Sequence, residues 1–331
     1  MEPPDTFRAY VAEHEAGVPS AVRELDRSAL GEDGVLVRIQ WSCLNFKDGL
    51  ASRPDGKVAR LSPLVLGVDL AGTVLASDDP RYAAGDVVLA HAHELGVSHH
   101  GGLAELARVP ADWIVPLAGG LTARESMILG TAGFTAALSV VELERHGLAP
   151  GDGPVLVTGA TGGVGSSAVA ILAARGYEVH ASTGKAEAHD WLRELGAGEI
   201  HGRNEIEAHA ERPLSKQLWA ATVDSVGGTT LAGALGSTRY RGAVAASGLT
   251  GGASLEMTVM PFILRNVALL GIDSANTPEP LRHEVWSRLA GDLRPRDLER
   301  LVCAEIDLDG VQAGLDTLLA GGARGRFLVR L

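Results

Sequence analysis

Residues 155–172 read VLVTGATGGVGSSAVAIL, a β-branched run followed by a glycine-rich turn and an apolar helical pattern. The composition predicts a strand at Val155–Thr158 and a helix from Val164 to Gly176. Glycine lets the backbone turn sharply, and it lets a pyrophosphate approach amide groups that no Cβ shields. The start of the helix then offers unpaired N–H groups and a positive dipole end to an anion. The stretch therefore predicts a nucleotide-binding turn. Its expected phosphate contacts are Thr161, Gly162, Gly163 and Val164.

The second strand of this pattern ends without an acidic residue. Residues 178–185 read EVHASTGK, at the distance where dinucleotide-binding proteins usually carry an Asp or Glu that holds a ribose hydroxyl. A carboxylate would repel a 2′-phosphate, whereas hydroxyl donors and a cation suit one. Arg203, after the next short strand, could reach the same phosphate. NADPH is thus favoured over NADH. The alternative is that Lys185 and Arg203 are ordinary surface charges. The expected 2′-phosphate contacts are Ser182, Thr183, Gly184, Lys185 and Arg203.

Strand and helix patterns alternate after this turn, which implies a parallel sheet covered on both faces. Residues 1–120 are instead β-rich, with short apolar runs bounded by Gly and Pro. Thr122 and Glu125 form a capping-box pattern before a long helical stretch. The fold class is therefore α/β, a β-rich domain plus a doubly wound parallel sheet. Cofactor bound to such a sheet lies across the carboxyl ends of its strands. Further expected cofactor contacts are Ser247, Leu249, Ile263 and Ser274.

The composition argues against several classes of protein. The 331 residues include 29 basic and 41 acidic side chains, a net charge of −12, which argues against sequence-independent nucleic-acid binding. No stretch approaches the ~20 apolar residues of a membrane helix, and the first residues lack the apolar run of a signal peptide. Cys43 and Cys303 are too few for a disulfide framework or a four-Cys zinc site. We expect a reduced, cytoplasmic protein that binds neither nucleic acid nor membrane.

Segments along nearly the whole chain carry a family resemblance, among them NFKDGLA, LGVDLAGTV, GGLAELARVP, GTAGFTAALSV, PFILRNVALLGIDS and GRFLVRL. The chain resembles the zinc-free quinone-oxidoreductase branch of the medium-chain dehydrogenase/reductase superfamily. More closely, it is similar to acryloyl-CoA reductases of the YhdH type. The resemblance implies a GroES-like catalytic domain at 1–122 and 277–331, and a Rossmann NADPH-binding domain at 123–276. It also implies a homodimer that reduces a C=C bond conjugated to a carbonyl in an enoyl-CoA substrate.

The resemblance also indicates catalytic residues and the absence of metal. Alcohol dehydrogenases of the superfamily bind zinc through an early Cys and a His-Glu pair, and the matching positions here are Asn45, Val68 and Asp69. An amide and a valine cannot replace a thiolate and an imidazole on Zn²⁺, so we predict no metal ligand in the site. Expected catalytic residues are Asn45, Phe46 and Lys47.

Their roles differ. Asn45 either donates to the substrate carbonyl or nicotinamide side, or holds its turn through local hydrogen bonds. Phe46 stands where close relatives often carry Tyr. It has no proton to donate, so the α-carbon proton comes from water or another group, or the substrate differs. Lys47 could contact a substrate phosphate.

The sequence does not decide between several functions. The scaffold also suits a quinone or other enone reductase, or an NADPH-binding sensor with little catalysis. The loop HAHELGVSHHGG, residues 91–102, carries four histidines. They could form a metal site, contact substrate near His99 or His100, or be solvated.

Overall fold

The structure, a computed structural model, describes residues 3–117 and 119–331 and divides the chain into two compact units. Unit 1 comprises Met1–Thr131, Ala275–His283 and Leu301–Leu331, and unit 2 comprises Ala132–Ser274 and Glu284–Arg300. Residues 284–300 thus group with the parallel-sheet unit, although the predicted boundaries placed 277–331 in the catalytic domain. The start of the long helix, up to Thr131, groups with the β-rich unit.

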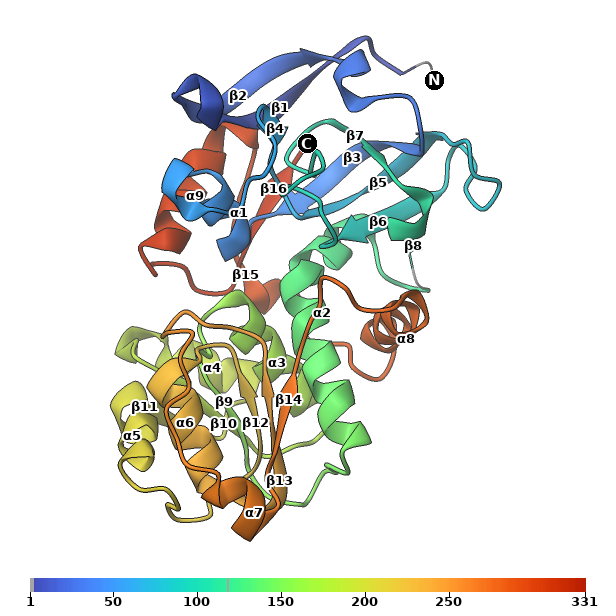
Figure 1. Cartoon of the computed structure of the whole chain (residues 1–331). Helices are drawn as coiled ribbons and strands as arrows, with labels where there is room; N and C mark the ends of the chain where they lie inside the picture. The colour runs from blue at the N-terminus through green and yellow to red at the C-terminus, as the bar shows by residue number, and fades with distance from the viewer. Residues whose placement is uncertain (1–2, 118) are drawn as a thin grey trace. The chain divides into compact units, whose positions relative to one another are not determined.

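Unit 1 is built from two sheets (Figure 1). A three-stranded sheet has the order β2-β1-β4, and a larger sheet has the order β15-β16-β3-β5-β6-β8, with β7 also paired to β3. The strands are β1 (Thr6–Glu13), β2 (Val18–Asp26), β3 (Val35–Cys43), β4 (Leu64–Val65), β5 (Asp69–Ala76), β6 (Val87–His91), β7 (Leu106–Val109), β8 (Ile114–Pro116), β15 (Val302–Ile306) and β16 (Arg326–Arg330). Two short helices, α1 (Phe46–Ala51) and α9 (Val311–Leu319), complete the unit.

The closing strand β16 brings the end of the chain beside its beginning. It pairs antiparallel with β3, so that Leu328 lies opposite Cys43. Alternate residues of β3, among them Val35, Val37 and Ile39, are buried in one apolar cluster with Leu70 of β5. This period of two is the pattern of a strand with one face in a core. The terminal segment GRFLVRL thus forms a closing strand, and its pairing places Arg326 next to residues near position 45.

Unit 2 contains one parallel sheet with the order β11-β10-β9-β12-β13-β14. Its strands are β9 (Val155–Val157), β10 (Val179–Thr183), β11 (Glu199–Gly202), β12 (Trp219–Asp224), β13 (Thr238–Ala246) and β14 (Ala268–Gly271). The order reverses between β9 and β12, and ligands of such sheets bind at the carboxyl ends beside the reversal. The predicted doubly wound sheet is confirmed.

Helices cover both faces of this sheet (Figure 1). They are α3 (Gly163–Ala174), α4 (His189–Leu195), α5 (Arg203–Ala208) and α6 (Gly228–Ser237), and a further helix, α7 (Met260–Arg265), lies at the amino edge of the sheet. Helix α3 packs against α4, and α5 packs against α6. Two further helices, α2 (Ala123–Arg145) and α8 (Glu279–Ala290), contain residues of both units.

Helix α2 starts with the predicted capping box. The Thr122 hydroxyl accepts from the Glu125 backbone N–H at 3.1 Å, and the Glu125 carboxylate accepts from the Thr122 backbone N–H at 2.9 Å. Gly130 interrupts the helix with φ 52° and ψ −158°. The expectation that no stretch is long and apolar enough to cross a membrane is wrong for α2 by length and composition, but 89% of its most apolar window is buried within the protein. It is therefore a core helix of the fold.

Candidate active site

A buried carboxylate organises the polar part of unit 1. Asp69, at the start of β5, is fully buried, where an unpaired charge is strongly unfavourable. Its carboxylate accepts from Asn45 Nδ2 at 2.7 Å, Cys43 Sγ at 3.0 Å, and the Thr131 backbone N–H and hydroxyl at 2.9 and 2.7 Å. The Arg326 guanidinium lies 3.9 Å away and is also buried. These residues form what we call the Asp69 cluster.

Arg326 connects this cluster to the loop before α1. Its guanidinium donates to Asn45 Oδ1 at 3.2 Å, Cys43 Sγ at 2.9 Å and the Ile128 carbonyl at 3.2 Å. Burial, and then the charge of Asp69, raise the pKa of the Cys43 thiol well above its usual range. Cys43 is therefore a protonated thiol that donates to one charged group and accepts from another, and it supplies neither a nucleophile nor a metal ligand at neutral pH.

A second carboxylate, Asp48, caps the start of α1. Its Oδ2 accepts from the Asn45 backbone N–H at 2.8 Å, and its Oδ1 accepts from the Val68 backbone N–H at 2.9 Å. Burial, and then the nearby charge of Asp69, raise the pKa of Asp48 to about 7. The hydrogen bonds oppose this rise, but desolvation is the larger effect. Asp48 therefore changes protonation in the neutral range while it holds the helix start.

These contacts determine what the start of α1 presents. The Asn45 side chain has partners on both sides, since Nδ2 donates to Asp69 and Oδ1 accepts from Arg326. Of its two open roles, the contacts support holding the turn. Phe46 follows with 43% of its surface exposed, and Lys47 is also exposed. The cluster thus anchors the start of α1, at which an apolar ring and a cation are exposed.

The positions equivalent to zinc ligands are filled by this hydrogen-bond network. Asn45 is engaged as described, Val68 is a buried apolar side chain, and Asp69 already accepts four hydrogen bonds. Among residues 3–117 and 119–331, the one group of His, Cys, Asp and Glu side chains spaced to hold a metal lies elsewhere, in unit 2. The donor set at this position therefore does not fit a catalytic zinc.

The histidine loop is held by packing. His91 is fully buried and lies 2.8 Å from Arg282 through its Nε2, so of the three alternatives the solvated one is wrong for this residue. His93 stacks on Trp113 with ring centroids 5.0 Å apart, and burial lowers its pKa to about 4. His100 Nδ1 accepts from the Val65 backbone N–H at 3.1 Å.

His99 completes the loop. Its Nδ1 lies 2.8 Å from the His100 carbonyl, and its ring packs edge-on against Trp113. His93 and His99 thus share Trp113, whereas His91 and His100 contact other residues, and the four histidines are not spaced to hold one metal ion.

The glycine turn of unit 2 has the predicted geometry. Strand β9 ends at Val157, and α3 begins at Gly163 with Gly162 as its exposed N-cap. Gly159 has φ 58°, and a Cβ on Gly165 would lie 2.3 Å from the Gly159 carbonyl oxygen. Only glycine fits both positions, because the backbone turns through a left-handed conformation and then passes against itself.

The end of β10 lies against this turn. The Ala160 N–H donates to the Ser182 carbonyl at 3.0 Å, and the Thr161 and Thr183 hydroxyls are 3.5 Å apart. A Cβ on Gly184 would lie 3.9 Å from the Arg203 guanidinium. Arg203 is exposed at the start of α5. The structure thus brings the glycine turn beside the end of β10 and Arg203 beside Gly184. Lys185 follows, and its backbone N–H donates to the Thr183 hydroxyl at 3.1 Å.

The remaining predicted cofactor contacts divide into two groups. Ser247 and Leu249 follow the carboxyl end of β13, and the Ser247 backbone N–H donates to the Asp224 carbonyl at 2.9 Å, at the end of β12. Ser274 follows the carboxyl end of β14. Ile263, 72% exposed, lies on α7, which precedes β14 and so sits at the amino edge of the parallel sheet. The structure does not bring Ile263 to the edge that holds the glycine turn.

Two residues of the site escaped the sequence analysis. They are Arg326 and Thr131, which no motif of the sequence singles out. For Arg326 the available signal was charge in a strand pattern, since RFLVR carries Arg326 and Arg330 around three apolar residues and VDLAG carries Asp69. A charge on a buried strand requires a partner of opposite sign.

Family profiles match both units. The profile described as alcohol dehydrogenase GroES-like domain matches residues 31–119, and the profile described as zinc-binding dehydrogenase matches residues 163–290.

Curated relatives align over nearly the whole chain. "Putative quinone oxidoreductase YhfP" of Bacillus subtilis is 50% identical over 326 residues, which cover 98% of this chain and 99% of the relative. "Acrylyl-CoA reductase AcuI" of Ruegeria pomeroyi is 48% identical over 328 residues, with 98% of each chain covered.

Solved structures agree. The crystal structure of Bacillus subtilis yhfP with NAD bound matches with a TM-score of 0.97 and 49% identity, covering 99% of this chain and 100% of that chain. The yhdH oxidoreductase from Salmonella enterica in complex with NADP matches with a TM-score of 0.94 and 47% identity, covering 98% and 99%.

Proposed function

This chain belongs to the medium-chain dehydrogenase/reductase family of oxidoreductases, and on that premise we propose that it uses NADPH to reduce the C=C bond of a short enoyl-CoA such as acryloyl-CoA. The reaction consumes NADPH and one proton. Hydride adds to the β-carbon, a proton adds to the α-carbon, and NADP⁺ and the saturated acyl-CoA are released. The cofactor supplies the hydride chemistry, and the protein supplies binding and orientation.

The residues at the end of β10 support NADPH as the cofactor. Ser182 and Thr183 precede the exposed Gly184, and the Arg203 guanidinium lies beside that glycine. No carboxylate stands at the strand end to hold a ribose diol or repel a phosphate. The 2′-phosphate would accept from Arg203 through charge-assisted hydrogen bonds.

The residues at the start of α1 suit a CoA thioester. Phe46 offers an apolar surface to the reacting centre, and it has no proton to donate, so the α-carbon proton comes from water or another group. Lys47 is an exposed cation suited to the phosphates of CoA. The Asp69 cluster favours one conformation of this helix start, because a rearrangement would break hydrogen bonds of buried polar groups and leave those groups unpaired.

A quinone is the second candidate substrate, because a relative 50% identical over nearly the whole chain is named a putative quinone oxidoreductase. The two candidates differ in what Lys47 contacts, since a simple quinone has no phosphate. NADPH oxidation is therefore measured with acryloyl-CoA, crotonyl-CoA and simple quinones, for the native chain and for Lys47→Met.

The proposal expects turnover of acryloyl-CoA, with a KM that rises about tenfold in Lys47→Met while kcat is unchanged. Quinone turnover that exceeds acyl-CoA turnover, and that is insensitive to Lys47→Met, would instead assign the quinone. Absence of turnover with every substrate would leave an NADPH-binding sensor as the function.

We also propose a cytoplasmic homodimer. Strand β14 is the edge of its sheet, and edge strands expose backbone groups that readily pair with a second chain. Exposed apolar side chains lie on and beside α7 and β14: Val259, Met260, Ile263, Leu264 and Leu269. Light scattering after size exclusion should give twice the 34.4 kDa chain mass, and Ile263→Asp should lower it toward the monomer. A native mass of one chain would contradict the dimer.

A further inference from the structure

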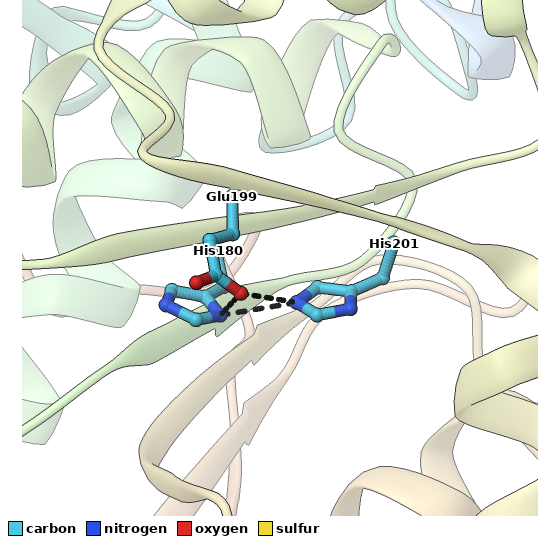
Figure 2. A group of neighbouring side chains, drawn as sticks. All are labelled: His180, Glu199 and His201. Atoms are coloured by element: carbon cyan, nitrogen blue, oxygen red, sulfur yellow. Dashed lines mark hydrogen bonds and ion pairs between the residues drawn. The ribbon is translucent and has the colours of Figure 1, made fainter.

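Three side chains on the outer strands of the unit 2 sheet converge on one point. His180 on β10 and Glu199 on β11 are register partners, and His201 lies two residues beyond Glu199. Because side chains alternate between the faces of a strand, all three project from the same face. Figure 2 shows the two imidazoles and the carboxylate turned toward one another. We call these residues the His180 group.

The spacing of their ligand atoms matches a metal ion. His180 Nδ1 lies 3.0 Å from His201 Nε2 and 3.6 Å from Glu199 Oε2, and His201 Nε2 lies 3.8 Å from the same oxygen. With metal–ligand bonds of ~2.0 Å, the edge of a coordination tetrahedron is about 3.3 Å. The triangle is therefore close to one face of such a tetrahedron, with the fourth position left for water.

The outer nitrogens of both rings face carboxylates. His180 Nε2 lies 3.2 Å from Glu178 Oε1, and His201 Nδ1 lies 3.4 Å from Glu205 Oε2. A neutral imidazole that donates to a carboxylate from one nitrogen presents a bare lone pair from the other. The facing nitrogens would then carry two lone pairs 3.0 Å apart, an arrangement that a cation between them relieves. A carboxylate behind each ring is also how proteins orient metal-ligating histidines.

The surroundings allow an ion to enter and remain. The His180 side chain is 8% exposed, His201 20% and Glu199 66%, so the point of convergence has a protein side and a solvent side. The group lines a cavity of about 450 Å³. Two cations, Lys216 and Arg239, line the same cavity. Three carboxylates, at positions 178, 199 and 205, lie around the rings and outnumber these cations.

We propose that His180, Glu199 and His201 bind a divalent transition-metal ion, with Zn²⁺ as the expected occupant. Two imidazoles and one carboxylate are a common ligand set for this ion, and Ca²⁺ or Mg²⁺ would prefer oxygen ligands only. The site shares no residue with the Asp69 cluster, and it adds a metal where the sequence analysis expected none.

A bound ion would stabilise the edge of the sheet. It would join β10 to the edge strand β11, and through His201 it would restrain Glu205, whose other oxygen accepts from the Gly202 N–H at 2.9 Å at the start of α5. Metal that binds the folded chain alone raises its thermal stability by mass action. The site therefore predicts a Zn²⁺-dependent rise in the melting temperature of the apo protein.

Trp219 provides a local probe for the test. Its ring packs edge-on against both imidazoles, with centroid distances of 5.4 Å to His180 and 5.2 Å to His201. Chelator-dialysed full-length protein is titrated with Co²⁺, and tryptophan fluorescence and visible absorption are recorded. We expect one equivalent per chain, quenching that is largely lost in Trp219→Phe, and displacement of Co²⁺ by Zn²⁺.

Variants decide whether this group holds the ion. Glu199→Gln and His201→Gln should each weaken Co²⁺ binding about 100-fold or more, and Glu205→Gln about tenfold. Glu199 is mostly exposed, so its variant remains folded and interpretable. The matched control is His146→Gln, an exposed histidine at the end of α2 in the same unit, which should bind Co²⁺ with unchanged affinity.

Either of two results overturns the proposal. One is no saturable Co²⁺ or Zn²⁺ binding by the apo protein, which would mean that the two imidazoles share only a proton. The other is binding that Glu199→Gln and His201→Gln leave unchanged, which would place the ion elsewhere, for example at the exposed Cys303. Neither result depends on turnover, so the proposed function stands or falls separately.

Discussion

Asp48→Asn tests the buried carboxylates of unit 1 through the pH dependence of stability. In the unfolded chain an Asp releases its proton near pH ~4, whereas burial and Asp69 raise the pKa of Asp48 to about 7 in the folded chain. Between these values the folded state holds one more proton than the unfolded state. Stability from this group is therefore fully present below pH ~4 and is lost as the pH rises through about 7.

The size of the effect follows from the shift. Three pKa units correspond to about 4 kcal/mol in total, of which about 3 kcal/mol falls between pH 5 and pH 8. Asn cannot ionise, so Asp48→Asn should remove this share of the pH dependence. The variant also replaces the oxygen that accepts from the Asn45 N–H at 2.8 Å, which costs a similar amount at every pH and cancels from the comparison.

The assay is urea-induced unfolding at pH 5 and pH 8. The native chain should lose about 3 kcal/mol more than Asp48→Asn between the two pH values. Asp33→Asn, which changes an exposed carboxyl in the same unit, is the control and should follow the native chain. If the native chain and Asp48→Asn lose the same stability over this interval, Asp48 does not titrate as burial requires, and the reasoning is refuted.

Four further outcomes follow from the two units. In fluorescence titrations the native protein should bind NADPH at least ~10-fold more tightly than NADH, and Arg203→Ala should remove most of this preference without weakening NADH binding. Equal affinities for the two cofactors in the native chain would contradict the 2′-phosphate site. Phe46→Leu should keep the single-turnover hydride step within roughly tenfold, because a lost general acid costs about 10²–10⁴-fold; a thousandfold loss with unchanged NADPH affinity would show that the ring positions the reacting atoms. Gly130→Ala should cost about 2–4 kcal/mol in thermal unfolding, because the new Cβ would lie 2.7 Å from Cys43 Sγ at a φ of 52°, and an unchanged melting temperature would count against the packing described. Turnover should survive prolonged dialysis against a chelator, and a loss that zinc restores would overturn the metal-free assignment of the catalytic unit.

Much of unit 2 could be predicted because its signals are local. The run from Val155 to Thr158, the glycines after it and the helical period that follows lie within twenty residues of one another. A parallel strand, its turn and its helix are adjacent in the chain, so their composition reports directly on the phosphate turn. The same holds for Ser182–Lys185, because the end of a strand is where its loop begins.

The Asp69 cluster could not be predicted in this way. Asn45 and Arg326 are 281 positions apart, and they meet only because β16 returns to pair with β3. Nothing in the local pattern around Asn45 indicates that its amide is occupied by distant partners. Its two possible roles could therefore be weighed only once the strand pairing was known.

The sequence alone determined the fold class, the glycine turn and the residues at the strand ends, because each depends on neighbours a few positions away. Tertiary structure alone decided which of those residues meet. The register of β10 against β11 places His180 opposite Glu199 and within 3.0 Å of His201. A shift of β11 by one residue would turn Glu199 and His201 to the face of the sheet opposite His180. That register is set by the packing of the whole unit, because hydrogen bonds between strands are similar at every register and only the buried faces distinguish one from another.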